Sequence, residues 1–196
     1  MSDAETLRVY AQRAQDYADR FTSNTTPPLL RAFIADLPAG GHALDLGCGP
    51  GHAAAAMAGA GLRVTALDPV AEMVALASAH AGVDTQIAGF DDIAGTNIYD
   101  GIWANFSLLH APRPDMPRHL AALVAALKPG GRFHIGLKTG TGSRRDPIGR
   151  LYTYYTDVEL TQLLQNAGLT ITDRTTGSGK GLDGVEAPWI CVAAHG

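Results

Sequence analysis

The sequence predicts an α/β protein with one doubly wound, Rossmann-like, mostly parallel sheet of seven strands and helices on both faces. Short apolar runs alternate with helical stretches along the chain. The first of these runs ends in a turn with glycine at alternate positions, Gly47, Gly49 and Gly51, and the second ends in an acid, Asp68. Glycine lacks Cβ and adopts positive φ, so such a turn brings bare backbone close to a ligand. In this architecture a nucleotide-like molecule usually binds there.

The first half of the chain shows apolar spacing and residues that start or stop helices. Side chains from Leu7 to Phe21 recur on one helical face, and Pro69 stands where a helix can begin. Short runs of Val, Ala, Leu and Thr are typical of strands. The predicted elements are helix 5–22, helix 29–37, strand 42–47, helix 51–60, strand 63–67, helix 70–79 and strand 83–88.

In the second half, stop signals and one capping motif set the boundaries. Residues 128–131 read Lys-Pro-Gly-Gly, which ends a helix and makes a turn. Thr156 and Glu159 have the spacing of a capping box. The predicted elements are strand 98–105, helix 115–127, strand 132–137, loop 138–150, a helix from Thr156 to Asn166, strand 169–175, loop 177–184 and strand 189–194.

Length and charge limit the classes of protein to consider. The 196 residues fit one domain, and we expect an N-terminal helical cap over 1–38 before the sheet domain at 39–196. Nucleic-acid-binding proteins usually carry a basic surface, so a net charge of −4 does not indicate nucleic acid as a main partner. No apolar run approaches the ~20 residues of a membrane span, and residues 1–5 do not resemble a signal peptide. We therefore expect a cytoplasmic monomer or homodimer without membrane or nucleic-acid partners.

The glycine turn departs from phosphate-binding turns in three respects. Its third glycine, Gly51, comes one residue earlier than in a dinucleotide fingerprint and is followed by His52. The turn has no lysine, which a phosphate-binding loop requires. Asp45 lies two residues before the first glycine, where a carboxylate would repel a pyrophosphate but attract an ammonium or sulfonium group.

Several segments match one known family in order along nearly the whole chain. Residues 45–51 read Asp-Leu-Gly-Cys-Gly-Pro-Gly and 66–68 read Ala-Leu-Asp; the other matching segments are 90–92, 99–110 and 127–131. With these motifs the chain resembles the class I S-adenosylmethionine-dependent methyltransferases, and its C-terminal part is similar to small bacterial tellurite-resistance-type members. The resemblance implies S-adenosyl-L-methionine as the cofactor.

The resemblance also implies a set of cofactor-binding positions at the strand ends. Asp68 would accept hydrogen bonds from both ribose hydroxyls, and it follows the first glycine at about the distance that this architecture requires; a cap for the next helix is its alternative role. Asp45 would face the cofactor amine or serve only at a strand end. One of Asp91 and Asp92 would lie beside adenine, with Asp91 preferred. The predicted cofactor-binding residues are Asp45, Gly47, Cys48, Gly49, Gly51, Asp68, Pro69, Met73, Phe90, Asp91, Asn105 and Tyr17.

Methyl transfer is an in-line displacement that mainly requires alignment and the exclusion of water. A general base is needed only when the acceptor carries a proton, and His110, at the end of the strand 98–105, is the candidate; a packed histidine is the alternative. The seven histidines are scattered and none has metal-ligand spacing with a carboxylate, so no metal is implied.

The acceptor pocket is expected to come from segments outside the sheet. Tyr10 and Tyr17 lie on one helical face and would either cover the cofactor or pack in the core. Guanidinium groups bind carboxylates and phosphates, so an arginine- and tyrosine-rich loop indicates a small anionic or aromatic acceptor; a solvated loop is equally consistent. The predicted acceptor-binding residues are Arg144, Arg145, Arg150, Tyr152 and Tyr154.

The sequence therefore predicts an S-adenosylmethionine-dependent methyltransferase that acts on a small molecule. Two other functions stay open. A non-catalytic protein that binds S-adenosylmethionine or S-adenosylhomocysteine needs the same turn. A nicotinamide-dependent oxidoreductase has the same sheet, but Asp45 and His52 disfavour it.

Overall fold

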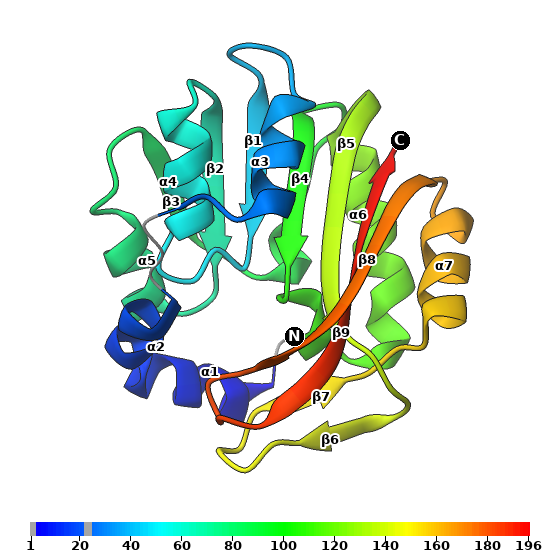
Figure 1. Cartoon of the computed structure of the whole chain (residues 1–196). Coiled ribbons are helices and arrows are strands. Elements are labelled where there is room, and N and C mark those ends of the chain that lie inside the picture. Colours follow the sequence, from blue (N-terminus) through cyan, green and yellow to red (C-terminus); the bar gives the residue numbers. More distant parts are fainter. Residues whose placement is uncertain (1–2, 22–24) are drawn as a thin grey trace.

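A seven-stranded sheet forms the centre of the molecule, as predicted (Figure 1). The computed structural model describes residues 3–21 and 25–196. The strand order is β3-β2-β1-β4-β5-β9-β8, and neighbours from β3 to β5 are parallel, whereas β9 is antiparallel to both β5 and β8. The direction of strand order reverses between β1 and β4, and in an open α/β sheet such a reversal opens a crevice at the carboxyl ends of the strands.

The strands of this sheet are β1 (His42–Leu46), β2 (Arg63–Asp68), β3 (Val83–Ile87), β4 (Tyr99–Asn105), β5 (Leu127–Lys138), β8 (Thr170–Lys180) and β9 (Glu186–His195). The helices are α1 (Ala4–Gln12), α2 (Ala14–Phe21), α3 (Pro28–Ala35), α4 (His52–Gly59), α5 (Ala71–Ala77), α6 (Met116–Ala126) and α7 (Asp157–Asn166). Short 3₁₀ turns cover Phe90–Asp92, Leu108–His110 and Arg113–Asp115.

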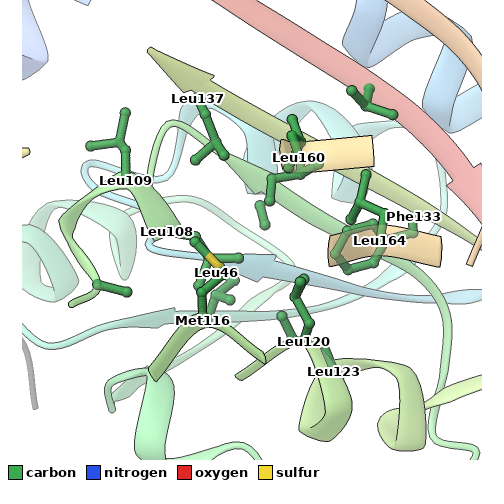
Figure 2. Packing of buried hydrophobic residues seen from close by; sticks show 14 of the residues in the cluster. Leu46, Leu108, Leu109, Met116, Leu120, Leu123, Phe133, Leu137, Leu160 and Leu164 are labelled. Atoms are coloured by element: carbon green, nitrogen blue, oxygen red, sulfur yellow. The ribbon is translucent and has the colours of Figure 1, made fainter. Parts of the chain in front are cut away.

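The two faces of the sheet bury two separate apolar clusters. Side chains alternate along a strand, so Leu44 and Leu46 of β1 face α6 and α7, whereas Ala43 belongs to the cluster under α3 and α4. Figure 2 shows the larger cluster, where Leu120 and Leu160 pack with other leucines around the sheet. Truncating one such buried leucine to alanine costs about 2–5 kcal/mol, so this packing fixes the position of the strand ends.

The carboxyl ends of the central strands are covered by elements from both ends of the sequence. Figure 1 shows α1 and α2 beyond the arrowheads of β1, β2 and β4, with a small hairpin beside them. This hairpin pairs β6 (Ser143–Arg145) with β7 (Leu151–Thr153) in antiparallel register. The predicted division of the chain at residue 38 stays a prediction; α3 packs against the sheet through Leu30 and Phe33. Residues 1–2 and 22–24 of the predicted cap lie outside the described residues.

The prediction of a single helix over 5–22 was wrong. The chain forms α1 and α2, with a break at Arg13, whose φ of −120° and ψ of 23° are not helical. Residue 22 lies outside the described part. Val9 before the break and Ala14 after it are both buried, so the change of direction lets both short helices pack inward.

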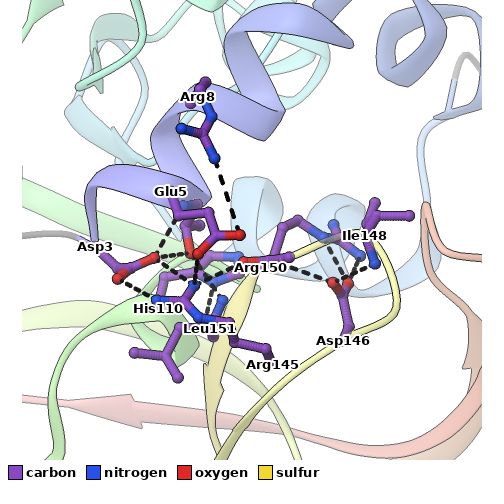
Figure 3. A network of polar contacts seen from close by, with 11 residues as sticks. Asp3, Glu5, Arg8, His110, Arg145, Asp146, Ile148, Arg150 and Leu151 are labelled. Atoms are coloured by element: carbon purple, nitrogen blue, oxygen red, sulfur yellow. Dashed lines mark hydrogen bonds and ion pairs between the residues drawn. The ribbon is translucent and has the colours of Figure 1, made fainter.

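The prediction of an irregular loop at 138–150 was also wrong, because β6 lies within it. Asp146 closes the connection to β7: its carboxylate accepts hydrogen bonds from the backbone N–H groups of Ile148 and Arg150 and from Nε of Arg150. Figure 3 shows this carboxylate facing Arg150 and Ile148. Side-chain hydrogen bonds, rather than apolar alternation, therefore define the hairpin.

Two glycine-containing stretches belong to strands rather than to the predicted turn and loop. The Lys-Pro-Gly-Gly stretch predicted as a turn lies inside β5, which begins at Leu127; the irregular register opposite Tyr99 accommodates it. The glycine-rich stretch predicted as a loop at 177–184 is strand as far as Lys180. A Cβ on Gly177 would lie 2.4 Å from Cζ2 of Trp189, so glycine is needed there for an indole ring on the paired strand.

The structure confirms one local prediction in the C-terminal half. Thr156 and Glu159 form the predicted capping box, since each side chain accepts a hydrogen bond from the backbone N–H of the other. Cys48 and Cys191 are both buried and free. None of the helices within residues 3–21 and 25–196 has the length and apolar character needed to cross a bilayer.

Candidate functional site

A cavity lies where the sheet meets α1 and α2. Its walls come from the glycine turn, the end of β2, the segment after β4, and the two N-terminal helices. The lining residues are Thr6, Leu7, Tyr10, Tyr17, Gly47, Gly49, Asp68, Pro69, Val70, Met73, Phe90, Asn105, Phe106, Ser107 and His110. Eight of the predicted cofactor-binding residues are among them: Gly47, Gly49, Asp68, Pro69, Met73, Phe90, Asn105 and Tyr17.

The first two glycines of the turn expose backbone to the cavity. Gly47 has a φ of +68°, and a Cβ there would lie 2.3 Å from Cβ of Ser107. Gly49 has a φ of +53°, and the nearest atom to a Cβ would be Cε1 of Tyr17 at 3.7 Å. A side chain at Gly47 would therefore collide with protein, whereas one at Gly49 would project toward the cavity space.

The third glycine has a different role. Gly51 does not line the cavity; it is the N-cap of α4, with a φ of +83°. A Cβ there would lie 2.8 Å from both Cα and Cβ of Ala77 in α5. Gly51 thus allows α4 and α5 to approach each other, and its predicted cofactor contact stays a prediction.

Asp68 joins the turn to the end of β2. Its Oδ2 accepts a hydrogen bond from the Gly49 N–H at 2.9 Å, and its Oδ1 accepts one from the Val70 N–H at 2.9 Å. The helix α5 has Val70 as its N-cap residue, so Asp68 supports the turn before the helix. Burial raises the pKa of Asp68 to about 6, against the effect of the two N–H donors. Each oxygen retains a lone pair for a ligand hydroxyl.

Asp45 lies behind the cavity wall. Its side chain is buried, and Oδ2 has no hydrogen-bond partner among the described residues. Burial raises the pKa of Asp45 to about 7. Cys48 is buried too, and its Sγ donates to the Gly49 carbonyl at 3.5 Å. Neither residue lines the cavity, so their cofactor contacts stay predictions.

The two acids after β3 lie outside the cavity walls. Asp91 pairs with Arg118 at 2.6 Å, and Asp92 accepts a hydrogen bond from the Gly89 N–H at 2.7 Å. Phe90, which precedes them, does line the cavity. A contact of Asp91 with adenine stays a prediction.

His110 lines the cavity and is part of a buried polar network (Figure 3). Its Nδ1 lies 2.7 Å from the carbonyl oxygen of Leu151, and its Nε2 lies 2.9 Å from the hydroxyl of Tyr10. The Tyr10 hydroxyl also accepts a hydrogen bond from Nη1 of Arg150 at 2.9 Å. Burial lowers the pKa of His110 to about 4, so the imidazole is neutral near pH 7.

The residues predicted to bind an acceptor have partners within the protein, and none lines the cavity. Arg150 pairs with Asp146 at 2.8 Å, and Arg145 pairs with Asp3 at 2.8 Å. The guanidinium carbon of Arg144 lies 3.9 Å from the centroid of the Tyr154 ring. Tyr152, in β7, and Tyr154, just after it, are both buried. Direct acceptor binding by these five residues stays a prediction.

Six lining residues were not among the predicted site residues: Thr6, Leu7, Tyr10, Val70, Phe106 and Ser107. Tyr10 carried a signal, since it shares a helical face with Tyr17, but core packing explained it equally well. Phe106 has a φ of +56°, which is uncommon for an aromatic residue and turns the chain after β4 into the cavity wall. Nothing in the local sequence predicts that conformation.

The known proteins that this chain resembles are methyltransferases. Residues 43–131 match the family model described as a methyltransferase domain. The chain is 41% identical over 99 residues to a ubiquinone/menaquinone biosynthesis C-methyltransferase of Rubrivivax gelatinosus, covering 48% of this chain and 38% of that protein. It is 31% identical over 158 residues to a ubiquinone biosynthesis O-methyltransferase of Xanthomonas axonopodis, covering 69% of this chain and 65% of that protein. The chain thus spans less than two thirds of the length of these relatives.

Solved structures share the fold. A 1,6-didemethyltoxoflavin-N1-methyltransferase of Burkholderia thailandensis, solved with 1,6-didemethyltoxoflavin and S-adenosylhomocysteine, superimposes with a TM-score of 0.76 at 26% identity, covering 98% of this chain and 87% of that one. A methyltransferase structure from Methanosarcina mazei gives a TM-score of 0.75 at 19% identity, covering 87% of this chain and 97% of that one. At this identity the likeness is evidence for a shared fold only.

Proposed function

We propose that the chain is a class I S-adenosylmethionine-dependent methyltransferase that transfers a methyl group from S-adenosylmethionine to a small aromatic acceptor. The observation that carries the proposal is that two groups of residues line one cavity, and we call them its glycine end and its tyrosine end. The glycine end comprises Gly47, Gly49 and Asp68, and the tyrosine end comprises Tyr10 and His110. A transferase needs both ends, because the donor and the acceptor must meet in one space.

The residues of the glycine end fit the cofactor. Asp68 holds the turn with one lone pair of each oxygen and has capacity left for a ribose diol. Gly49 leaves open space where a side chain would project. The buried Oδ2 of Asp45 has no hydrogen-bond partner among the described residues, and its charge favours a cationic ligand nearby. When bound, the cofactor supplies a methyl carbon on a sulfonium leaving group.

The protein's own contribution is position and the exclusion of water. α1 and α2 cover the cavity with Leu7 and Tyr17, while Phe106 forms the wall after β4. Such a partly apolar enclosure holds the two reactants in line and keeps competing water away.

Several features support a small aromatic acceptor rather than an anionic one. The tyrosine end is lined by aromatic rings, and its nearest arginine, Arg150, is paired with Asp146. The similar proteins are a C-methyltransferase of ubiquinone/menaquinone biosynthesis, an O-methyltransferase of ubiquinone biosynthesis and a 1,6-didemethyltoxoflavin-N1-methyltransferase. The acceptor, the oligomeric state and the cytoplasmic location expected from the sequence remain predictions.

A methyl-transfer screen with labelled S-adenosylmethionine against phenols, ring N–H heterocycles, carboxylates, thiols and amines tests the proposal. We expect turnover with a phenol or a ring N–H compound. Calorimetric titration should show S-adenosylhomocysteine binding and no heat with NADH. Binding of NADH alone would contradict the cofactor, and cofactor binding with no acceptor would favour a non-catalytic binding protein.

A further inference from the structure

Three side chains from distant parts of the sequence form a continuous chain of hydrogen bonds at the tyrosine end. Arg150, after the hairpin turn, reaches Tyr10 on α1, and Tyr10 reaches His110 in the 3₁₀ turn after β4; both distances are 2.9 Å. Tyr10 and His110 line the cavity, whereas Arg150 is 2% exposed and lies behind them. The network thus runs from the protein interior to the cavity surface.

The direction of every proton in this chain follows from its partners. A carbonyl oxygen only accepts, so the hydrogen of His110 sits on Nδ1 and points to Leu151. Nε2 is then an acceptor. A guanidinium only donates, so the Tyr10 oxygen accepts from Arg150, and the Tyr10 hydroxyl donates its own proton to Nε2 of His110.

We propose that Tyr10 and His110 form a two-step proton relay, oriented by Arg150, that accepts the proton of an aromatic hydroxyl or ring N–H as the acceptor is methylated. The relay rests on the proposed function and names its acceptor class. Tyr10 is the residue that touches the acceptor, and Arg150 is a positioning residue that acts through it.

The step balances in atoms and charge. The acceptor's O–H or N–H bond breaks, its proton passes to the Tyr10 oxygen, and the Tyr10 proton passes to Nε2 of His110. The electron pair left on the acceptor atom forms the new bond to the methyl carbon, and the sulfur–carbon bond breaks to leave a neutral thioether. The positive charge that began on sulfur ends on the His110 imidazolium, whose Nδ1–H remains bonded to the Leu151 carbonyl.

The surrounding charges keep the relay in its accepting state. Burial lowers the pKa of His110 to about 4, and the positive charge of Arg150 acts in the same direction, so Nε2 is unprotonated near pH 7. Asp146 balances Arg150 at 2.8 Å, with both side chains nearly fully buried, and Lys138 lies over the adjacent Tyr152 ring at 4.2 Å. A weak base suits an acceptor whose hydrogen becomes acidic as methylation proceeds.

The first test reads the network without turnover. In protein with isotopically labelled histidine nitrogens and bound S-adenosylhomocysteine, NMR should show His110 neutral, with hydrogen on Nδ1. Tyr10→Phe should shift the Nε2 resonance toward that of a nitrogen without a hydrogen-bond donor. A hydrogen on Nε2, or no shift in the variant, would overturn the relay.

The second test measures transfer to phenol, catechol and benzimidazole. Tyr10→Phe should lower kcat by about a hundredfold or more while S-adenosylhomocysteine affinity changes less than about threefold. Wild-type turnover in mixtures of light and heavy water should show two protons in motion through a curved proton inventory. Tyr99→Phe is the matched control, because that tyrosine also contacts a histidine, His42, with ring centroids 4.7 Å apart, but lies outside the cavity wall.

The outcomes separate the relay from the proposed function. Equal kcat in wild type and Tyr10→Phe, or a linear inventory, would overturn the relay while leaving methyl transfer intact. A wild-type protein that binds S-adenosylhomocysteine but methylates none of the three compounds would overturn both. An intact NMR signature in that case would show that the three side chains hold α1 in place and move no proton.

Discussion

The two ends of the cavity are assembled in opposite ways. At the glycine end, Asp68 binds the backbone of Gly49, only 19 positions earlier in the chain. At the tyrosine end, Tyr10 meets His110 and Arg150, which follow it by 100 and 140 positions. The first end is a local motif of adjacent strands. The second end forms only when segments far apart in the sequence pack together. Cofactor binding should therefore depend on the glycine end, and turnover on the tyrosine end.

Of the substitutions that test the role of each end, Asp68→Ala is expected to have the largest effect, on cofactor affinity. The variant removes two acceptors for ribose hydroxyls, each worth about 1.5–3 kcal/mol when made to a charged group, and leaves the Gly49 and Val70 N–H groups without their partner. S-adenosylhomocysteine affinity, measured by calorimetry, should fall about a hundredfold or more. Asp84→Ala, an exposed acid on β3, is the control. An affinity within about threefold of wild type would restrict Asp68 to a structural role.

Two glycine variants should separate an effect on protein stability from an effect on ligand binding. Gly51→Ala places a methyl group 2.8 Å from Ala77 at positive φ and should cost about 2–4 kcal/mol of unfolding free energy, with little effect on affinity in the folded fraction. Gly49→Ala should cost only about 1–2 kcal/mol and weaken S-adenosylhomocysteine binding at least about tenfold. Urea unfolding and calorimetry measure both quantities. The reverse pattern would mean that Gly51, not Gly49, faces the ligand.

The carboxylate behind the glycine end should give a pH signature. The pKa of Asp45 is about 7 in the native state, above its value in the unfolded chain, so the native state binds this proton more tightly. Its contribution to stability is present at pH 4 and lost as pH rises toward 7. Asn cannot titrate, so between pH 4.5 and 8 the unfolding free energy of Asp45→Asn should rise relative to wild type by about 2–4 kcal/mol. Equal slopes in urea unfolding would contradict this.

The smallest effect should come from the outer edge of the tyrosine end. Arg145 holds Asp3, the N-cap of α1, through two hydrogen bonds of 2.8 Å, but the pair is solvent-exposed. Arg145→Ala should therefore change the unfolding free energy of the whole protein very little. Hydrogen exchange should quicken in α1 and not in α7. Arg174→Ala, which removes an exposed pair with Asp157 on α7, should give the opposite pattern, and unaltered α1 exchange would show that other contacts hold the helix.

The same contrast explains what the sequence could predict. The β1–β2 motif, the acid at Asp68 and the Thr156 capping box depend on spacing over a few residues, and the structure places each as expected. The sheet order follows from alternation of strands and helices, which the apolar pattern reveals.

What the sequence did not predict depends on contacts between distant segments. The β6 strand, Ser143–Arg145, is exposed and lacks apolar alternation; it is defined by Asp146 and by its pairing with β7. His110 was predicted from its place at a strand end, but its partner Tyr10 could not be, because helix spacing alone does not show what a tyrosine faces. The arginines of the hairpin suggested ligand binding, whereas their carboxylate partners, Asp3 and Asp146, became evident only in three dimensions.

The most direct test of the account is a crystal structure of the protein with S-adenosylhomocysteine. We expect the ribose hydroxyls within hydrogen-bond distance of Asp68, the amino-acid part along Gly47 and Gly49, and the sulfur directed toward Tyr10. A ribose bound away from Asp68, or a ligand outside this cavity, would contradict the division of the site into a cofactor-binding glycine end and an acceptor-binding tyrosine end.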